Sequence, residues 1–104
     1  MTLTSKKSDS LEATLEIIGD KWTLLLIRSL SHEPLPFCKL ECSLEGISPR
    51  TLSQRLEILE GEKIISKRLY CKHPVRHKYL LTQKGRDLQN VLNSMSQWGR
   101  KYLS

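Results

Sequence analysis

The sequence predicts a mainly α-helical fold with one small β-hairpin, an α+β class in which strands are the minority. Apolar residues recur at helical spacing through most of residues 11 to 60 and again beyond residue 83. Between these segments, residues 63 to 81 lose the helical period and alternate apolar, aromatic and basic side chains. Helices, then a hairpin, then a last helix follow the plan of a winged helix-turn-helix with extra N- and C-terminal helices.

The chain of 104 residues fits a single domain spanning 1–104, in which the polar segment 1–8 is expected to be flexible. The longest apolar run, 24–27, is far too short to span a bilayer. Lys6 and Lys7 are not followed by an apolar segment of the signal-peptide type. We therefore expect a cytoplasmic protein with no membrane partner. An odd number of cysteines, three, does not suggest a disulfide framework.

Charge is segregated along the chain, whose net charge is +6. Residues 9–20 contain four acids and no Lys or Arg, whereas residues 63–86 contain eight Lys or Arg and no acid. In a small domain this distribution favours a polyanionic partner. The alternative is a basic face that is merely solvated.

Two helices are expected before residue 32. Ser10 can cap the first, over 11–18, and Gly19 suits its C-terminal end. Asp20 can cap the second, over 21–31, which is apolar on almost every side. A helix of that kind is normally central and buried, so we expect it at the middle of the fold.

A helix-turn-helix is expected over 36–60. A short helix over 36–44 is followed by a turn at 45–46, and Ser48 and Pro49 suit the N-cap and first position of a second helix. The apolar face of this second helix consists of Leu52, Leu56 and Leu59. In this motif the second helix is the recognition helix, which enters a groove of DNA.

Residues 63–81 are expected to form the wing, a basic hairpin. Its first strand starts near Ile64 and ends at Tyr70, residues 71–76 form the turn, and residues 77–81 return. No Asn-Gly or Asp-Gly pair marks the turn, so its geometry stays open.

The last helix, capped by Thr82, is expected from residue 83 to about 97, with a further short helical turn beyond it. The whole segment 83–103 is our candidate dimerisation helix, together with the first helix. The predicted dimer interface consists of Leu11, Leu15, Leu88, Val91, Leu92, Met95, Trp98 and Tyr102. The alternative is that the apolar stripe of the last helix only closes the core of the monomer.

Polar side chains off the apolar face of the recognition helix can donate to bases and phosphates. We predict that bases are read by Arg50, Thr51 and Gln54. Phosphate contacts are assigned to Ser48, Ser53 and Arg55. The alternatives are that Ser48 acts only as a helix cap and that Arg55 only pairs with an acid. Wing contacts with DNA are assigned to Lys72, His73, Arg76 and Lys78, with Lys67 and Arg68 as further basic residues. The alternative is an ordinary solvated helix face.

Three segments occur in order along nearly the whole chain: IIGDKWTLLLIR at 17–28, GISPRTLSQRL at 46–56 and YLLTQKGR at 79–86. In this combination, with Pro74 and Arg76 in the wing, the chain resembles the HxlR-type winged helix transcription regulators, relatives of the MarR group. The resemblance implies a homodimeric bacterial or archaeal DNA-binding regulator. It places residues 48–55 in the major groove, residues 72–78 in the wing contact and the terminal helices in the dimer.

The chain departs from the family at one position. Several members sense quinones, aldehydes or oxidants through a cysteine in a Cys-Pro-x-Glu pattern near the start of the first helix. Asp9 stands at that position here. Because Asp forms no thiolate, this switch is not carried over.

Other chemistry finds little support. Candidate metal ligands are Cys38, Cys42, Cys71, His73 and His77, but they form no CxxC pair and lie on different elements, so neither a metal nor another cofactor is expected. Most free cysteines are small buried apolar residues, which is what we expect of these three, and thiol sensing by Cys38, Cys42 or Cys71 stays open. No catalytic constellation is present, so we expect no enzyme. The prediction is a sequence-specific regulator on palindromic double-stranded DNA with an unknown effector; the alternatives are a protein-interaction module and a non-specific DNA-binding protein.

Overall fold

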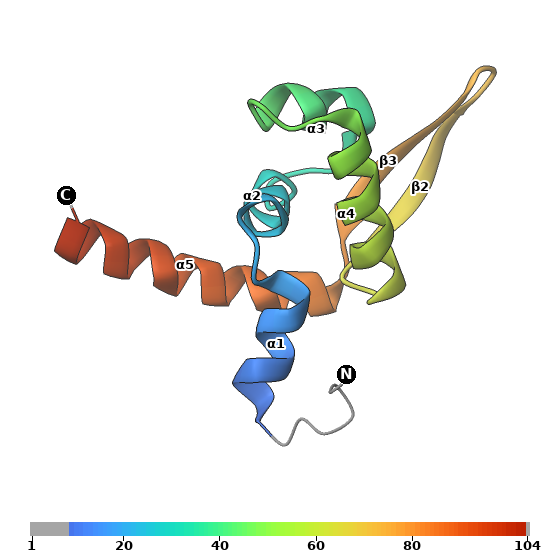
Figure 1. Ribbon diagram of the computed structural model, residues 1–104. Coiled ribbons are helices and arrows are strands. Elements are labelled where there is room, and N and C mark those ends of the chain that lie inside the picture. Colours follow the sequence, from blue (N-terminus) through green and yellow to red (C-terminus); the bar gives the residue numbers. More distant parts are fainter. Residues whose placement is uncertain (1–8, 104) are drawn as a thin grey trace.

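The computed structural model describes residues 9–103 (Figure 1). Within them the elements follow in the order α1 (Ser10–Ile18), α2 (Lys21–Ser29), β1 (Leu35–Pro36), α3 (Phe37–Ser43), α4 (Pro49–Gly61), β2 (Ile65–Lys72), β3 (Val75–Leu81) and α5 (Gln83–Leu103). The predicted class, mainly α with a small sheet, is confirmed. The flexibility expected of residues 1–8 concerns residues outside this span.

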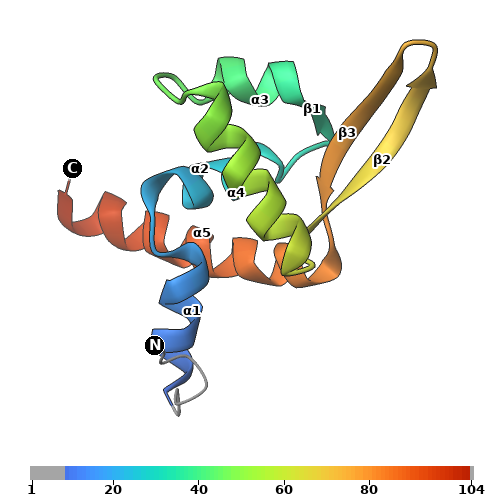
Figure 2. The same ribbon diagram turned by 45° about the vertical axis from the view of Figure 1, so that its right-hand side comes forward.

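Helix α2 lies at the centre of the fold, as predicted, because it contacts α1, α3, α4 and α5. Helix α5 runs across the lower half of the molecule with α1 extending below it, and the β2–β3 hairpin projects at the end opposite to the C-terminus (Figures 1 and 2). The most deeply buried side chains are those of Thr23, Leu26, Ile27, Leu40, Leu52, Leu59 and Ile65. The core is therefore built from the apolar faces of α2, α3 and α4 and the start of the wing.

The ends of the first two helices differ from the prediction by one or two residues. Asp9, rather than Ser10, caps α1, and its carboxylate accepts the Leu11 N–H at 2.9 Å. Both residues are good caps, so composition alone does not decide between them. Helix α2 ends at Ser29, because Leu30 turns out of the helix while its N–H is shared by the Leu26 and Ile27 carbonyls.

The sheet is antiparallel with strand order β1-β3-β2. Strand β1 was not predicted; its Leu35 and Pro36 pair with Tyr79 and Lys78. Two residues carry no periodicity, and a proline is tolerated here because β1 is an edge strand. The wing is also longer than predicted, since only residues 73–74 lie outside its strands and the expected turn at 71–76 is wrong.

Helix α4 ends where its sequence predicts, and the chain reverses there through a Schellman motif. The Ile64 N–H donates to the Leu59 carbonyl at 2.9 Å, and the Lys63 N–H donates to the Glu60 carbonyl at 3.1 Å. Lys63 takes the left-handed backbone conformation, with φ of 65°, where glycine is usual. The buried pair Leu59 and Ile64 closes the motif and starts the wing at a fixed angle.

Thr82 and Gly85 fix α5 against the start of the wing. The Thr82 hydroxyl donates to the Lys63 carbonyl at 2.6 Å, and its oxygen accepts the Gly85 N–H at 3.2 Å. A Cβ on Gly85 would collide with the Ile64 carbonyl. The predicted Thr82 cap is confirmed, and glycine is required at residue 85 because two backbones meet there.

Helix α5 is continuous from Gln83 to Leu103, which matches the predicted segment 83–103, and the helix does not end near residue 97. Trp98 and Tyr102 therefore lie on the same helix as Leu92. None of the helices within residues 9–103 is long and apolar enough to cross a bilayer.

Candidate nucleic-acid interface

The start of α4 is held by the cap that its sequence predicts. Ser48 Oγ accepts the Thr51 N–H at 3.1 Å and donates to the Thr51 hydroxyl at 3.0 Å. Pro49 occupies the first turn, where no N–H is needed. The core takes up the apolar face of the helix, whose Leu52, Leu56 and Leu59 are no more than 3% exposed. The opposite face is therefore turned to solvent.

That free face carries the residues predicted to read bases. Arg50, Ser53 and Gln54 are exposed, whereas Thr51 is half-buried and its hydroxyl accepts a hydrogen bond from the capping Ser48. Arg50 and Gln54 are one helical turn apart and share a face. Within the described residues neither has a hydrogen-bond or ion-pair partner. Both planar side chains are thus available for bidentate pairing, Arg with guanine and Gln with adenine.

Arg55 takes the alternative role that its sequence left open, as the partner of an acid. Its Nε lies 3.4 Å from Asp20 Oδ1, within ion-pair distance but without a hydrogen bond. Asp20 caps α2 by accepting the Thr23 N–H at 2.9 Å and the Thr23 hydroxyl at 2.8 Å. Burial raises the pKa of Asp20, but the Thr23 hydrogen bonds and the Arg55 charge outweigh it and hold that pKa below 3.8. Arg55 thus ties the recognition helix to the central helix.

The wing presents basic side chains at two levels. Lys72, His73 and Arg76 are exposed together at its tip, where Lys72 pairs with Val75 and Arg76 with Cys71. The predicted tip contacts are thus brought together, whereas Lys78 lies nearer the base, directly opposite Arg68.

Like charges directly opposite each other destabilise a hairpin. Repulsion between Arg68 and Lys78 therefore destabilises the free hairpin, and a bound anion would relieve it.

Tyr70 is a wing residue that sequence reasoning missed. Pairing slips by one residue between Leu69 and Cys71, which makes Tyr70 the extra residue of a β-bulge. The Lys78 Nζ lies 5.0 Å from the centroid of the Tyr70 ring, a cation–π contact that orients the ammonium group. An aromatic residue inside a basic run was the available signal, but the bulge that turns it toward Lys78 leaves no mark in the sequence.

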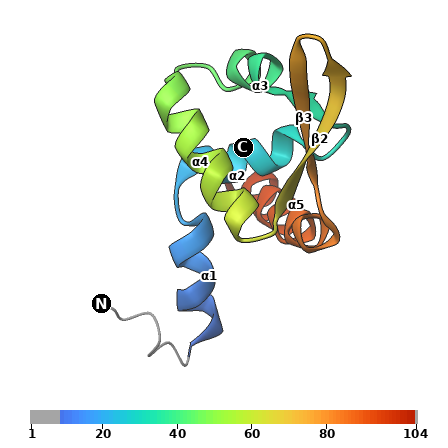
Figure 3. The ribbon, with the colours of Figure 1, turned by 90° about the vertical axis from the view of Figure 1, so that its right-hand side faces the viewer.

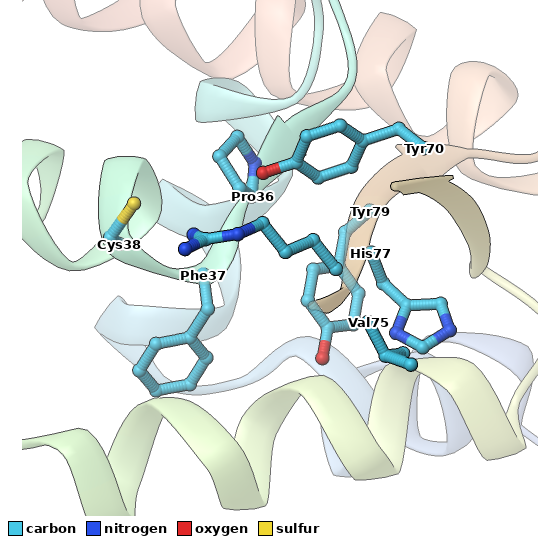
Figure 4. A pocket seen from close by; sticks show the side chains of 8 residues that line it. Pro36, Phe37, Cys38, Tyr70, Val75, His77 and Tyr79 are labelled. Carbon is cyan, nitrogen blue, oxygen red and sulfur yellow. The ribbon is translucent and has the colours of Figure 1, made fainter. Parts of the chain in front are cut away.

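A hollow of about 330 Å³ lies between the start of α3 and the wing (Figure 4). Its walls are formed by Pro36, Phe37, Cys38, Tyr70, Val75, Arg76, His77 and Tyr79. A neighbouring hollow of about 300 Å³ shares Phe37 and Tyr79 with it and reaches Ser53 on α4. The two hollows form a strip from the recognition helix to the wing, two elements that meet at the base of the wing and diverge from it in Figure 3.

A second surface is apolar and lies on α1 and α5, away from the wing (Figure 1). Six residues of the predicted interface are 49–64% exposed: Leu11, Leu15, Val91, Met95, Trp98 and Tyr102. We call these six residues the terminal apolar face. Leu92, in contrast, is 8% exposed within the core, and Leu88 packs against that core. Leu92 therefore closes the core of the monomer, whereas Leu88 keeps part of its surface exposed; helical period alone does not say which neighbour covers a stripe.

The cysteines are not where the sequence placed them. Cys38 and Cys42 are exposed and Cys71 is half-buried, and all three are free. The assignment of Cys38 and Cys42 to buried apolar positions is wrong because short helix α3 turns only Leu40 fully into the core. Among residues 9–103, the His, Cys, Asp and Glu side chains form no group suited to a metal ion.

The sequence model of the HxlR-like helix-turn-helix family matches residues 17–104. The chain belongs to this family. YtcD of Bacillus subtilis, an HTH-type transcriptional regulator, is 31% identical over 99 residues, which cover 95% of this chain and 79% of YtcD. An HTH-type transcriptional regulator of Mycobacterium tuberculosis is 37% identical over 97 residues, which cover 93% of this chain and 61% of that protein. The HxlR-like chain thus spans only about three fifths of the second relative.

Solved structures agree with this assignment. The crystal structure of a MarR-family transcriptional regulator from Porphyromonas gingivalis W83 superposes with a TM-score of 0.85 at 25% identity and covers 99% of this chain and 100% of the other. The winged helix-turn-helix plan and the HxlR-type regulator class predicted from the sequence are therefore confirmed.

Proposed function

We propose that this HxlR-like protein is a homodimeric, sequence-specific regulator that binds a palindromic operator in double-stranded DNA. The observation that supports it best is α4, whose apolar face is buried while Arg50 and Gln54 stand exposed without partners. Binding of chromosomal DNA would place the protein in the cytoplasm, and it requires no catalytic group.

In this proposal Arg50 and Gln54 read base edges, and each bidentate pair contributes roughly 1–3 kcal/mol of discrimination between bases. Thr51 assists from the edge of the same face. Ser53 contacts phosphate, as does Ser48 to the extent that its capping hydroxyl allows. Lys72, His73 and Arg76 contact DNA from the tip of the wing, and Lys78 does so from its place over Tyr70.

The terminal apolar face supports the dimer. Large exposed apolar side chains concentrated on two helices of a small domain mark an interaction surface, and a self-complementary surface gives a closed two-fold dimer. In such a dimer the two α4 helices would enter successive major grooves about 34–36 Å apart. A palindromic operator follows from the two-fold symmetry of its reader.

The oligomeric state and DNA binding can be tested together. Sedimentation equilibrium and binding of a mixed duplex pool would compare wild type with a double variant, Leu15→Asp with Met95→Asp, and with the conservative control Met95→Leu. We expect dimeric wild type and control, and a folded monomeric double variant that binds DNA about 100-fold more weakly because the second half-site no longer helps. A wild type that stays monomeric while it binds one duplex site tightly would contradict the dimer.

A further inference from the structure

A protein that reaches two adjacent grooves must straddle one sugar–phosphate strand, because that strand separates the major from the minor groove. The proposed function places α4 in the major groove and the wing tip beyond it. The hollow lies between α3 and the wing, and the neighbouring hollow, which shares Phe37 and Tyr79 with it, continues to Ser53 on α4. We propose that this hollow seats the DNA strand itself, with a phosphate against Arg76 and the adjoining sugar against Pro36 and Phe37.

The length of the wing suits this placement. Strand β2 contains eight residues, which at about 3.4 Å each make it roughly 27 Å long. That is about twice the 12 Å width of the major groove, so the tip extends past the groove that α4 occupies. The strand bounding that groove then passes beside the part of β3 that lines the hollow, from Val75 at the tip to Tyr79 nearer the base.

The chemistry of the hollow fits a phosphate and its sugar. Arg76 has no acidic partner among residues 9–103, so its charge is available for a charge-assisted contact. None of the residues that line the hollow is an acid. Pro36, Phe37 and Val75 offer apolar contact suited to a deoxyribose.

The neighbouring hollow is less suited to an anion. It contains Glu57 and Glu60 beside Lys67. Two carboxylates repel a phosphate, which assigns the phosphate to the hollow of Arg76 and leaves the neighbouring one to the flank of α4.

Figure 4 shows that the hollow has two sides. Cys38 and Phe37 lie on the α3 side, and Tyr70, His77 and Tyr79 lie on the wing side. A strand seated between them would touch both sides at once. The inference, which rests on the proposed function, thus adds Phe37, Cys38 and Tyr70 to the DNA contacts.

Cysteine chemistry gives a direct test, because α3 carries a matched pair of thiols. Cys38 lines the hollow, whereas Cys42, one helical turn later, is also exposed but does not line it. Lys39 and Lys72, with Arg50 and Arg68, place the three cysteines in separate tryptic peptides. Alkylation of each thiol by iodoacetamide can therefore be followed separately by mass spectrometry in the unaltered protein.

The alkylation rate is measured without DNA and with the best-bound duplex at ten times its dissociation constant. Since about one tenth of the protein is then free, Cys38 should react about tenfold more slowly, while Cys42 should change by less than about twofold. If Cys38 reacts equally fast in the DNA-bound protein, the proposal that the hollow seats a DNA strand is wrong, while the proposed DNA-binding function still stands. Failure to bind any duplex would overturn both. Protection of Cys38 by inorganic phosphate alone would indicate a free-anion site and contradict a strand seat.

Charge placed on the same two positions supplies a second test. Cys38→Asp puts a carboxylate beside the seated phosphate and should weaken duplex binding about tenfold or more, while Cys42→Asp should change it by less than about threefold. Circular dichroism confirms that each variant is folded. Equal effects of Asp at residues 38 and 42 would contradict the seat.

Discussion

Replacement of Asp20 by Asn tests how the recognition helix is held to the body of the protein. Asn keeps an acceptor for the Thr23 N–H but removes the charge that faces Arg55. The Arg55 and Asp20 side chains are 30% and 38% exposed, so solvent screens their attraction and we expect it to contribute about 0.5–1 kcal/mol. Hydrogen bonds to a carboxylate are stronger than those to a neutral amide, so weaker Thr23 contacts should add about 0.5–1 kcal/mol to the cost of Asp20→Asn.

The free energy of unfolding should therefore fall by about 1–2 kcal/mol at pH 7, or roughly 4–8 °C in Tm for each kcal/mol. Because the folded-state pKa of Asp20 lies below its ordinary value, the unfolded chain takes up the proton first. The stabilisation is thus present above about pH 4 and is lost as the pH falls through the folded-state pKa. The difference between wild type and Asp20→Asn should shrink accordingly.

Urea unfolding followed by circular dichroism at pH 7 and at lower pH values measures this difference. The double-mutant cycle with Arg55→Ala should return a coupling of about 0.5–1 kcal/mol at pH 7. A cost for Asp20→Asn that is the same at every pH, or a coupling indistinguishable from zero, would refute the charge-based account of this junction.

Three further predictions follow from the same geometry. Gly85→Ala should destabilise the fold by about 1–3 kcal/mol, because its Cβ would meet the Ile64 carbonyl. Gly61→Ala, whose Cβ meets nothing within 4 Å, should instead stabilise α4 by up to about 1 kcal/mol. Equal Tm values for the two variants would rule out the close approach at Gly85. Lys63→Gly should raise the free energy of unfolding by about 0.5–1 kcal/mol, because glycine adopts the left-handed backbone of residue 63 without strain. Lys63→Ala removes the charge but keeps the strained backbone, so it should give no gain. A gain in both variants would point to charge instead. Arg76→Ala should shallow the slope of log K against log salt for duplex binding by about one unit, and an unaltered slope would remove Arg76 from the phosphate contacts.

The sequence predicts α4 well because the information is local. Ser48 and Pro49 mark the start of the helix, and the spacing of its leucines determines which face is buried. The central place of α2 is equally local, since a helix that is apolar nearly all round must be buried. Every one of these features depends on residues within one or two helical turns of each other.

The features that sequence reasoning missed depend on distant partners. Strand β1 exists only because β3 pairs with Leu35 and Pro36. The wing extends to Lys72 and Val75 because ladder hydrogen bonds, rather than apolar alternation, carry its exposed end. Leu92 belongs to the core because α2 packs on α5, and a helical stripe does not reveal its neighbour.

The candidate site shows the same division between local and distant information. The positions of Arg50 and Gln54 on the free face of α4 follow from the helical period. The Asp20–Arg55 pair joins residues 35 positions apart, and sequence reasoning left its partner open. The hollow combines residues 36–38 with residues 70–79, which meet only after the sheet has formed.

The central claim is that the free face of α4 reads DNA bases within a dimer. Selection of binding sites from random duplex DNA at physiological salt tests it most directly, with wild type and the Arg50→Ala/Gln54→Ala variant run side by side. We predict that wild type recovers an inverted repeat with half-sites about one helical turn apart and that the variant loses its preference at the central positions of each half-site. A wild type that enriches no sequence, or a variant that recovers the same repeat unaltered, would contradict the claim.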